Sequence, residues 1–153
     1  MMKLAEALQE RSDLNRAIAQ LKERLNDNAL VQEGETTAED PEQLKQALDQ
    51  SILRLSHLIR CINQTNCATQ IGGETLTALI AKKDALSLKI SIYKEIAATG
   101  SQTSYRARNT EIKIKSAISV ADWRSEIDRM AKELRLLDNQ LQQCNWSTEL
   151  IES

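Results

Sequence analysis

Hydrophobic residues in the first 28 positions recur with the seven-residue period of a helix that packs along one side. Two rows that each step by seven lie next to each other on such a helix: Leu4, Arg11, Ile18 and Leu25, and Ala7, Leu14, Leu21 and Asn28. Charged and other polar residues fill most of the remaining positions and suit a solvent-facing side with i,i+4 pairs. The pattern predicts an amphipathic helix over 3–28.

The same periodicity returns in three further segments. The apolar side of the second segment is formed by Leu44, Leu48, Ser51, Leu55, Leu58 and Ile62. Asp40 is placed to cap this helix, with Pro41 at its first position. Ser119 and Asp122 give the last helix a similar start. The predicted helices cover 41–65, 75–98 and 119–143.

The third helix differs from the others because its apolar residues do not form one narrow stripe. Leu88 and Ile92 fall outside the side that carries its other large apolar residues. A helix of this kind is expected to be buried on more than one side. Gly100 is a suitable C-terminal stop for it.

Polar segments separate the helices. Residues 29–40 contain Gly34 among threonines and acids, and residues 63–74 contain two adjacent glycines. Both segments are predicted to be loops or turns. The C-terminal tail is expected to leave the last helix with Trp146 as its main anchor.

The segment 101–118 has a different pattern. Within it, residues 111–115 read Glu-Ile-Lys-Ile-Lys, which alternates with the two-residue period of an extended chain. We predict one short extended arm over about 110–116. A single strand makes no sheet, so this arm would pair across a symmetry axis or lie on helices.

These elements predict an all-α fold in which four long helices form two antiparallel coiled-coil-like hairpins within a single domain over 1–153. The apolar residues are mainly Leu, Ile and Ala, and the chain has no Phe. Long helices with small core side chains suit thin hairpins, which usually bury their remaining stripes by association. We therefore expect a homo-oligomer that uses the heptad seams and charged loops.

Composition excludes several classes of function. The 153 residues carry a net charge of −2, so bulk electrostatics do not favour nucleic acid or an anionic membrane. No run approaches the ~18 apolar residues of a membrane span, and no signal-peptide core is evident. Three cysteines, an odd number, are expected to be reduced in a cytoplasmic protein.

No motif in the sequence points to catalysis. His57 lacks the Glu partner of a di-iron helical bundle, and His57 with Cys61 is most simply a pair beside a core stripe. We expect no catalytic residue, no metal and no cofactor. One alternative stays open, in which the loop carboxylates Glu33, Glu35 and Glu111 hold a divalent ion in a small-molecule enzyme.

Charge is unevenly distributed between two irregular segments. Residues 28–43 contain five acids and no base, and residues 101–117 contain four bases against one acid. The segments are expected either to be solvated loops or to pair within or between subunits. A basic arm with Tyr105 that holds a phosphate or RNA backbone is a weaker alternative.

Amide-rich helix ends are the other polar feature of the sequence. Such side chains usually cap backbone groups, and the alternative is a polar pocket walled by Glu33, Glu35, Asn66 and Trp146. The candidate binding or subunit-contact residues are Glu33, Glu35, Asn63, Asn66, Arg106, Arg108, Glu111, Lys113, Asn145 and Trp146.

Several segments resemble a family of small bacterial proteins of unknown function, some of which carry the name septicolysin. One of them is I-N-Q-T-N at 62–66, and the more specific ones are Q-E-G-E at 32–35 and N-W-S-T-E-L at 145–150. The resemblance implies a helical domain of cytoplasmic type with no established activity and no catalytic residue to transfer. The name also implies a lesser alternative, a cytolysin-like toxin.

Overall fold

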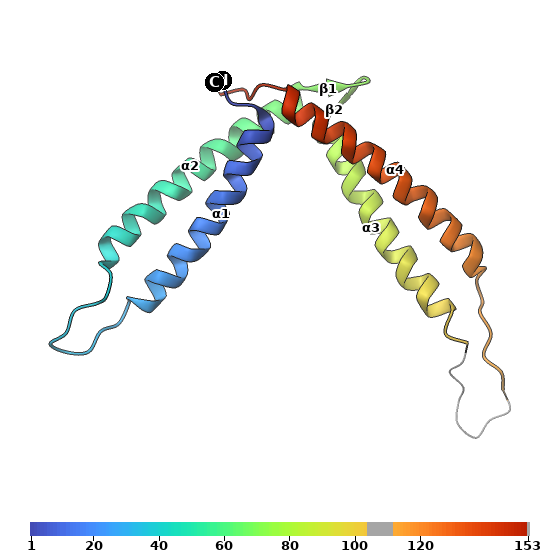
Figure 1. The fold of residues 1–153 in the computed structure, drawn as a ribbon, viewed down its shortest axis with the longest axis horizontal. Helices are drawn as coiled ribbons and strands as arrows, with labels where there is room; N and C mark the ends of the chain where they lie inside the picture. The colour runs from blue at the N-terminus through green and yellow to red at the C-terminus, as the bar shows by residue number, and fades with distance from the viewer. Residues whose placement is uncertain (104–111, 153) are drawn as a thin grey trace. The chain divides into compact units, whose positions relative to one another are not determined.

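The computed structural model describes residues 1–103 and 112–152, and it confirms a mostly helical fold of two hairpins. Its elements are shown in Figure 1: α1 (Leu4–Asp27), α2 (Pro41–Ala68), β1 (Gln70–Ile71), β2 (Glu74–Thr75), α3 (Leu76–Gly100) and α4 (Val120–Ser147). The chain divides into two compact units. The first comprises residues 1–75 with 143–153, and the second comprises residues 76–142.

The core of the first unit lies between α1 and α2, which run antiparallel (Figure 1). The buried side chains come from the predicted heptad rows: Leu4, Ala7 and Leu21 on α1, and Leu44, Leu58 and Ile62 on α2. Full burial of such an aliphatic side chain contributes roughly 1.5–3 kcal/mol. The hydrophobic period therefore identified the packed side of both helices correctly.

The loop from α1 to α2 is tied down at both ends. Asp40 caps α2 by accepting a hydrogen bond from the Glu42 N–H at 3.0 Å, with Pro41 at the first helical position, as predicted. Asn28 is buried, its side-chain N–H donates to the Arg24 carbonyl at 2.8 Å, and its Oδ1 accepts from the Glu39 N–H at 3.0 Å. Arg24 also forms an ion pair with Glu39. The polar residue in the heptad row thus joins the helix end to the loop.

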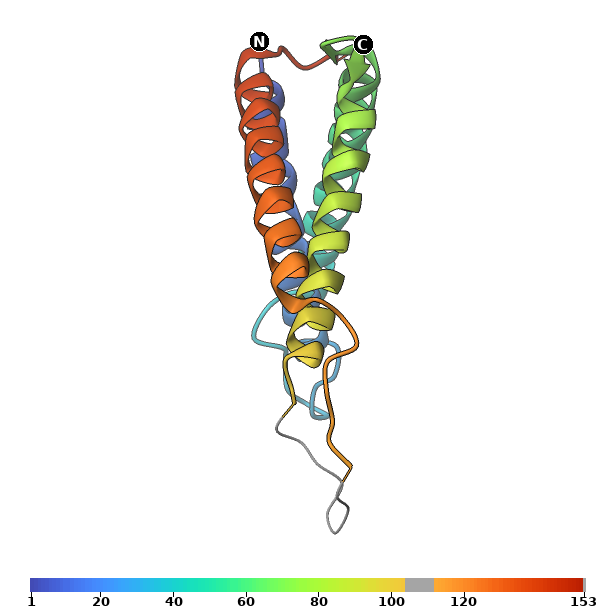
Figure 2. The ribbon, with the colours of Figure 1, turned by 90° about the vertical axis from the view of Figure 1, so that its right-hand side faces the viewer.

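The two chain ends meet at the other end of this hairpin, where Figure 2 shows the tail crossing from α4 to α2. The Leu4 N–H donates to the Thr148 carbonyl at 2.8 Å, and the Leu150 N–H donates to the Met2 carbonyl at 2.9 Å. The Ile151 N–H donates to Oγ1 of the buried Thr65 at 2.9 Å. These bonds place the Leu150 side chain in the core.

Leu150, rather than Trp146, is therefore the anchor of the tail, and the prediction for Trp146 was wrong. Leu150 is 2% exposed, whereas Trp146 lies on the last turn of α4 and is 52% exposed. The helix continues past the predicted end at 143 to Ser147, which turns the Trp146 ring toward solvent.

The paired glycines make the predicted turn and also a small hairpin that the sequence pattern did not indicate. Gly72 and Gly73 have φ values of 59° and 87°, and they link β1 to β2 in an antiparallel pair. Two central residues with positive φ are the requirement of a two-residue type I′ hairpin turn, which glycine meets without steric cost. The α2 helix reaches Ala68, three residues past its predicted end.

The second unit packs α3 against α4. Its core contains Ile90 and Ala97 from α3 with Ile127 and Met130 from α4. Partly buried aromatic rings extend this core: the Tyr93 and Trp123 centroids lie 4.7 Å apart at an interplanar angle of 41°. The predicted cap of the last helix is present, because Ser119 Oγ accepts from the Asp122 N–H at 3.4 Å.

The predicted extended arm is described only in part. Residues 112–116 have no regular secondary structure, and residues 110 and 111 lie outside the described part of the chain. The alternating Ile and Lys side chains at 112–115 are all exposed.

One ion pair between α1 and α2 gives a testable pH dependence. Arg54 Nε and Nη2 donate to the two Glu10 carboxylate oxygens at 2.8 and 2.9 Å, and these hydrogen bonds hold the Glu10 pKa below its ordinary value. A lowered pKa stabilises the fold at pH values above the ordinary pKa, and the stabilisation is lost as pH falls through the lowered pKa. Glu10→Gln should therefore cost about 0.5 kcal/mol near neutral pH, since both groups are partly exposed.

Urea unfolding of this variant near neutral pH and at about pH 3 checks the prediction. The difference from wild type should shrink as the pH falls, because protonation of the wild-type carboxyl removes the ion pair. Glu23→Gln, on the exposed side of α1, serves as the control. An equal loss at both pH values would contradict the role assigned to the ion pair.

Candidate interaction surface

The α3 helix is apolar on two opposite sides. Its inner side, with Leu79, Ile90 and Ala97, is buried in the second unit. At about 100° of rotation per residue, Ile92 lies about 200° around the helix axis from Ile90. A second apolar row follows this opposite side, and all its members are exposed. We call it the outer strip: Ala81, Ala85, Leu88, Ile92 and Ile96.

The large side chains of the outer strip are well exposed. Leu88 is 62% exposed, Ile92 47% and Ile96 39%. The prediction that α3 is buried on more than one side was therefore wrong for the single chain, which buries the inner side and leaves the outer strip exposed. Apolar rows of this kind, when they are contiguous and framed by polar residues, mark interaction sites.

Charged residues frame the outer strip with opposite signs on its two edges. On the helix, Lys82 and Lys89 fall on one edge, and Asp84 and Glu95 fall on the other. The Lys89 ammonium lies 5.4 Å from the centroid of the Tyr93 ring. This cation–π contact holds the ammonium along the basic edge of the outer strip. The surface is thus an uncharged row between a basic and an acidic border.

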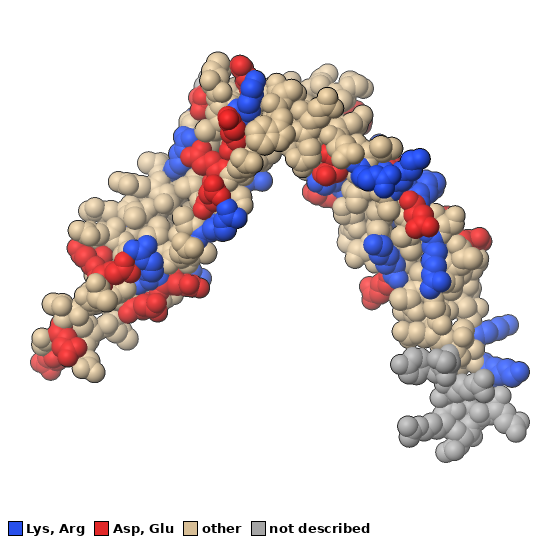
Figure 3. Space-filling model, in the orientation of Figure 1, with Lys and Arg blue, Asp and Glu red and all other residues tan. Residues whose placement is uncertain are grey.

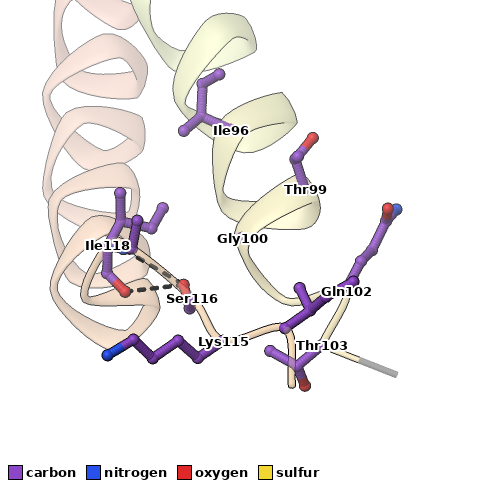
Figure 4. Close-up of a pocket in the computed structure, with 10 residues that line it drawn as sticks. Ile96, Thr99, Gly100, Gln102, Thr103, Lys115, Ser116 and Ile118 are labelled. Carbon is purple, nitrogen blue, oxygen red and sulfur yellow. Dashed lines mark hydrogen bonds between the residues drawn. The ribbon is translucent and has the colours of Figure 1, made fainter. Parts of the chain in front are cut away.

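A cavity of about 290 Å³ lies at the C-terminal end of α3, next to the outer strip (Figure 4). Ile96 and Gly100 line it from α3, and Ser116 and Ile118 line it from the segment before α4. A Cβ atom at Gly100 would lie 2.8 Å from Ile118 Cδ1, so glycine allows this close packing. The Ser116 hydroxyl donates to the Ile118 carbonyl at 2.9 Å, which fixes the turn into α4.

The charged candidates from the sequence lie on two separate segments. Glu33 and Glu35 are exposed on the loop between α1 and α2, where acidic side chains gather in Figure 3. Lys113 is exposed on the segment before α4. Arg106, Arg108 and Glu111 lie outside the described residues. Pairing of the acidic with the basic segment therefore stays a prediction.

The amide candidates do not form a pocket with the acidic ones. Asn63 and Asn66 lie in the last turns of α2, whereas Glu33 and Glu35 lie in the loop before its first turn. About 40 Å of helix separates these ends, at 1.5 Å per residue. Asn145 is half-buried on the last turns of α4, next to the exposed Trp146. The prediction of a polar pocket walled by Glu33, Glu35, Asn66 and Trp146 was therefore wrong, because the length of α2 separates its acidic members from Asn66.

The histidine–cysteine pair belongs to the core. Cys61 Sγ lies 3.6 Å from His57 Nε2, and Cys61 is fully buried. The sequence placed Cys61 beside the core stripe, and the structure places it inside. Among residues 1–103 and 112–152, no cluster of three His, Cys, Asp or Glu residues could hold a metal ion. No helix in the same residues has the length and hydropathy to span a membrane.

Comparison with known proteins identifies the family. Residues 11–150 match a family of unknown function, DUF6847. The chain belongs to this family. A crystal structure of a functionally unknown conserved protein from Corynebacterium diphtheriae is similar to this chain, with 36% identity and a TM-score of 0.92. The match covers 98% of this chain and 99% of that one, and no curated protein matches.

In this DUF6847 chain, the sequence pattern indicated part of the outer strip but did not mark it as a site. Leu88 and Ile92 were singled out as residues off the main stripe. The fuller signal is the spacing of five uncharged residues from Ala81 to Ile96 on the side opposite the buried one.

Proposed function

We propose that this member of the family is a non-enzymatic helical protein that acts by self-association, and that it does so in the cytoplasm. The observation that carries the proposal is the outer strip on α3, because a soluble helix hairpin needs only one apolar side for its own core. Burying the exposed parts of Leu88, Ile92 and Ile96 would add hydrophobic stabilisation of roughly 25 cal/mol per Å². The odd number of cysteines, with Cys61 buried as a thiol beside His57, supports a reducing compartment.

A second copy of the chain is the partner that its own features favour. Ala81 and Ala85 are small enough to let another helix backbone approach closely. The net charge of −2 gives little repulsion between copies.

Light scattering on a size-exclusion column tests the proposal. We expect the wild-type mass to be a multiple of 17.2 kDa at high protein concentration. Ile92→Glu should shift the mass toward 17.2 kDa, because it places a charge in the middle of the outer strip. Leu53→Glu is the matched control, since Leu53 is an exposed leucine on α2.

Two outcomes would contradict the proposal. A wild-type mass of 17.2 kDa at every concentration would remove self-association. An oligomer that Ile92→Glu leaves intact would remove the outer strip as its surface. Circular dichroism of each variant establishes that a change in mass is not a loss of helix.

A further inference from the structure

We propose that two copies of the chain pair in parallel and in register through the outer strip, so that each α3 lies along the α3 of the second copy. This inference rests on the proposed self-association and specifies its geometry. It follows from the order of residues within the outer strip and from the charges on its two edges.

The spacing of the outer strip fits a short coiled-coil seam. Successive members Ala81, Ala85, Leu88 and Ile92 are separated by four, three and four residues, which assigns them to heptad positions d, a, d and a. In this register Glu95 falls at the next d position and Ile96 at position e, so the apolar seam ends at Ile92. Ile92 then occupies position a, and Leu88 occupies position d. A β-branched residue at a with leucine at d favours two parallel strands. Ile92 and Leu88 therefore favour a pair of helices that run parallel.

The edge charges favour the same arrangement. In this register Asp84 occupies position g and Lys89 occupies position e of the following heptad. These two positions face each other between parallel helices, so Asp84 of each copy meets Lys89 of the other. In an antiparallel pair the e positions of the two copies face each other. Lys82 and Lys89 of one copy would then face the same lysines of the other copy. Parallel pairing thus replaces facing lysines with two ion pairs, which offset the repulsion between the two Glu95 side chains at the d position after the seam.

The helix is already formed before it associates, which favours a short seam. In the single chain α3 runs from Leu76 to Gly100 and packs on α4 through Ile90 and Ala97. Isolated helices of this length lose much of their pairing energy to the ordering of the backbone, and that cost is absent here. The inner side stays on α4 while the outer strip meets the second copy.

Cysteine cross-linking tests the direction of pairing. In a Cys67→Ser, Cys144→Ser background, Ala85→Cys places one thiol at an a position, where the two copies of a parallel in-register pair are adjacent. Mild oxidation should then give a disulfide-linked dimer of twice 17.2 kDa on a non-reducing gel. Ala98→Cys is the matched control, because it is an exposed alanine on α3 that lies off the outer strip.

A charge exchange tests the register independently. Lys89→Glu should raise the dimer dissociation constant several-fold, because it sets a glutamate against Asp84. Adding Asp84→Lys to that variant should restore the wild-type value, since the two ion pairs return with their signs exchanged. An antiparallel pair predicts no such rescue.

The outcomes separate this inference from the proposal on which it rests. Fast cross-linking at position 85, slow cross-linking at position 98 and rescue by the double exchange support parallel pairing. A wild-type oligomer without cross-linking at 85 or without rescue overturns parallel pairing and leaves self-association standing. A wild-type monomer overturns both.

Discussion

Leu150→Ala is expected to lower the free energy of unfolding of the first unit by about 3 kcal/mol. Leu150 is 2% exposed, and hydrogen bonds hold its backbone and its neighbour's in place. Its own N–H donates to the Met2 carbonyl, and the N–H of Ile151 donates to Thr65 Oγ1. The tail therefore cannot easily move inward to fill the space, and the full cost of a cavity is expected.

Urea unfolding and hydrogen exchange together measure this effect. Amides near Leu4 on α1 and near Thr65 on α2 should exchange faster in the variant, because they lie beside the site of the change. Trp146→Ala is the control from the same segment, and its cost should be within about 0.5 kcal/mol since the ring is exposed. A larger loss from Trp146→Ala than from Leu150→Ala would restore Trp146 as the anchor.

The tail shows which parts of this fold the sequence could predict. Periodicity identified the packed side of α1 and α2 because residues such as Leu58 and Ile62 repeat over many turns. Leu150 and Ile151 form a short apolar pair among polar residues, so no period marks Leu150. Its burial depends on hydrogen bonds to segments more than 80 residues away, which a local pattern does not contain. The large, amphipathic Trp146 drew attention to the wrong residue.

The sequence likewise predicted only part of the candidate site. The off-stripe positions of Leu88 and Ile92 were visible in the sequence, but two interpretations fit them, burial inside the chain or burial against a partner. The structure leaves both residues exposed in the single chain, which excludes the first interpretation and leaves the second as a proposal. The length of α2 sets Glu33 and Asn66 apart, and a list of polar residues carries no such distance.

The core of the second unit is thin, and this affects both the stability of the unit and its proposed association. The core cluster around Met130 takes four side chains from two helices, and one of them is the small Ala97. A second copy on the outer strip, as we propose, would add apolar burial on the other side of α3.

Met130→Ala is expected to cost about 3 kcal/mol in the second unit. Met130 is 2% exposed and packs in the core cluster that contains Ile90 and Ala97. The small Ala97 side chain has no methylene groups to extend into the space, so the cavity should persist. The fluorescence of Trp123, which stacks on Tyr93 beside this core, reports the unfolding of the unit.

A Trp146→Phe background makes the measurement specific, because Trp146 lies in the first unit and is the other tryptophan of the chain. Leu136→Ala on α4 is the matched control, and its cost should be within about 0.5 kcal/mol since Leu136 is 53% exposed. All variants are compared at one protein concentration, because association adds to apparent stability by mass action. Equal losses from Met130→Ala and Leu136→Ala would mean that α4 buries both residues, and the assignment of its inner side would then be wrong.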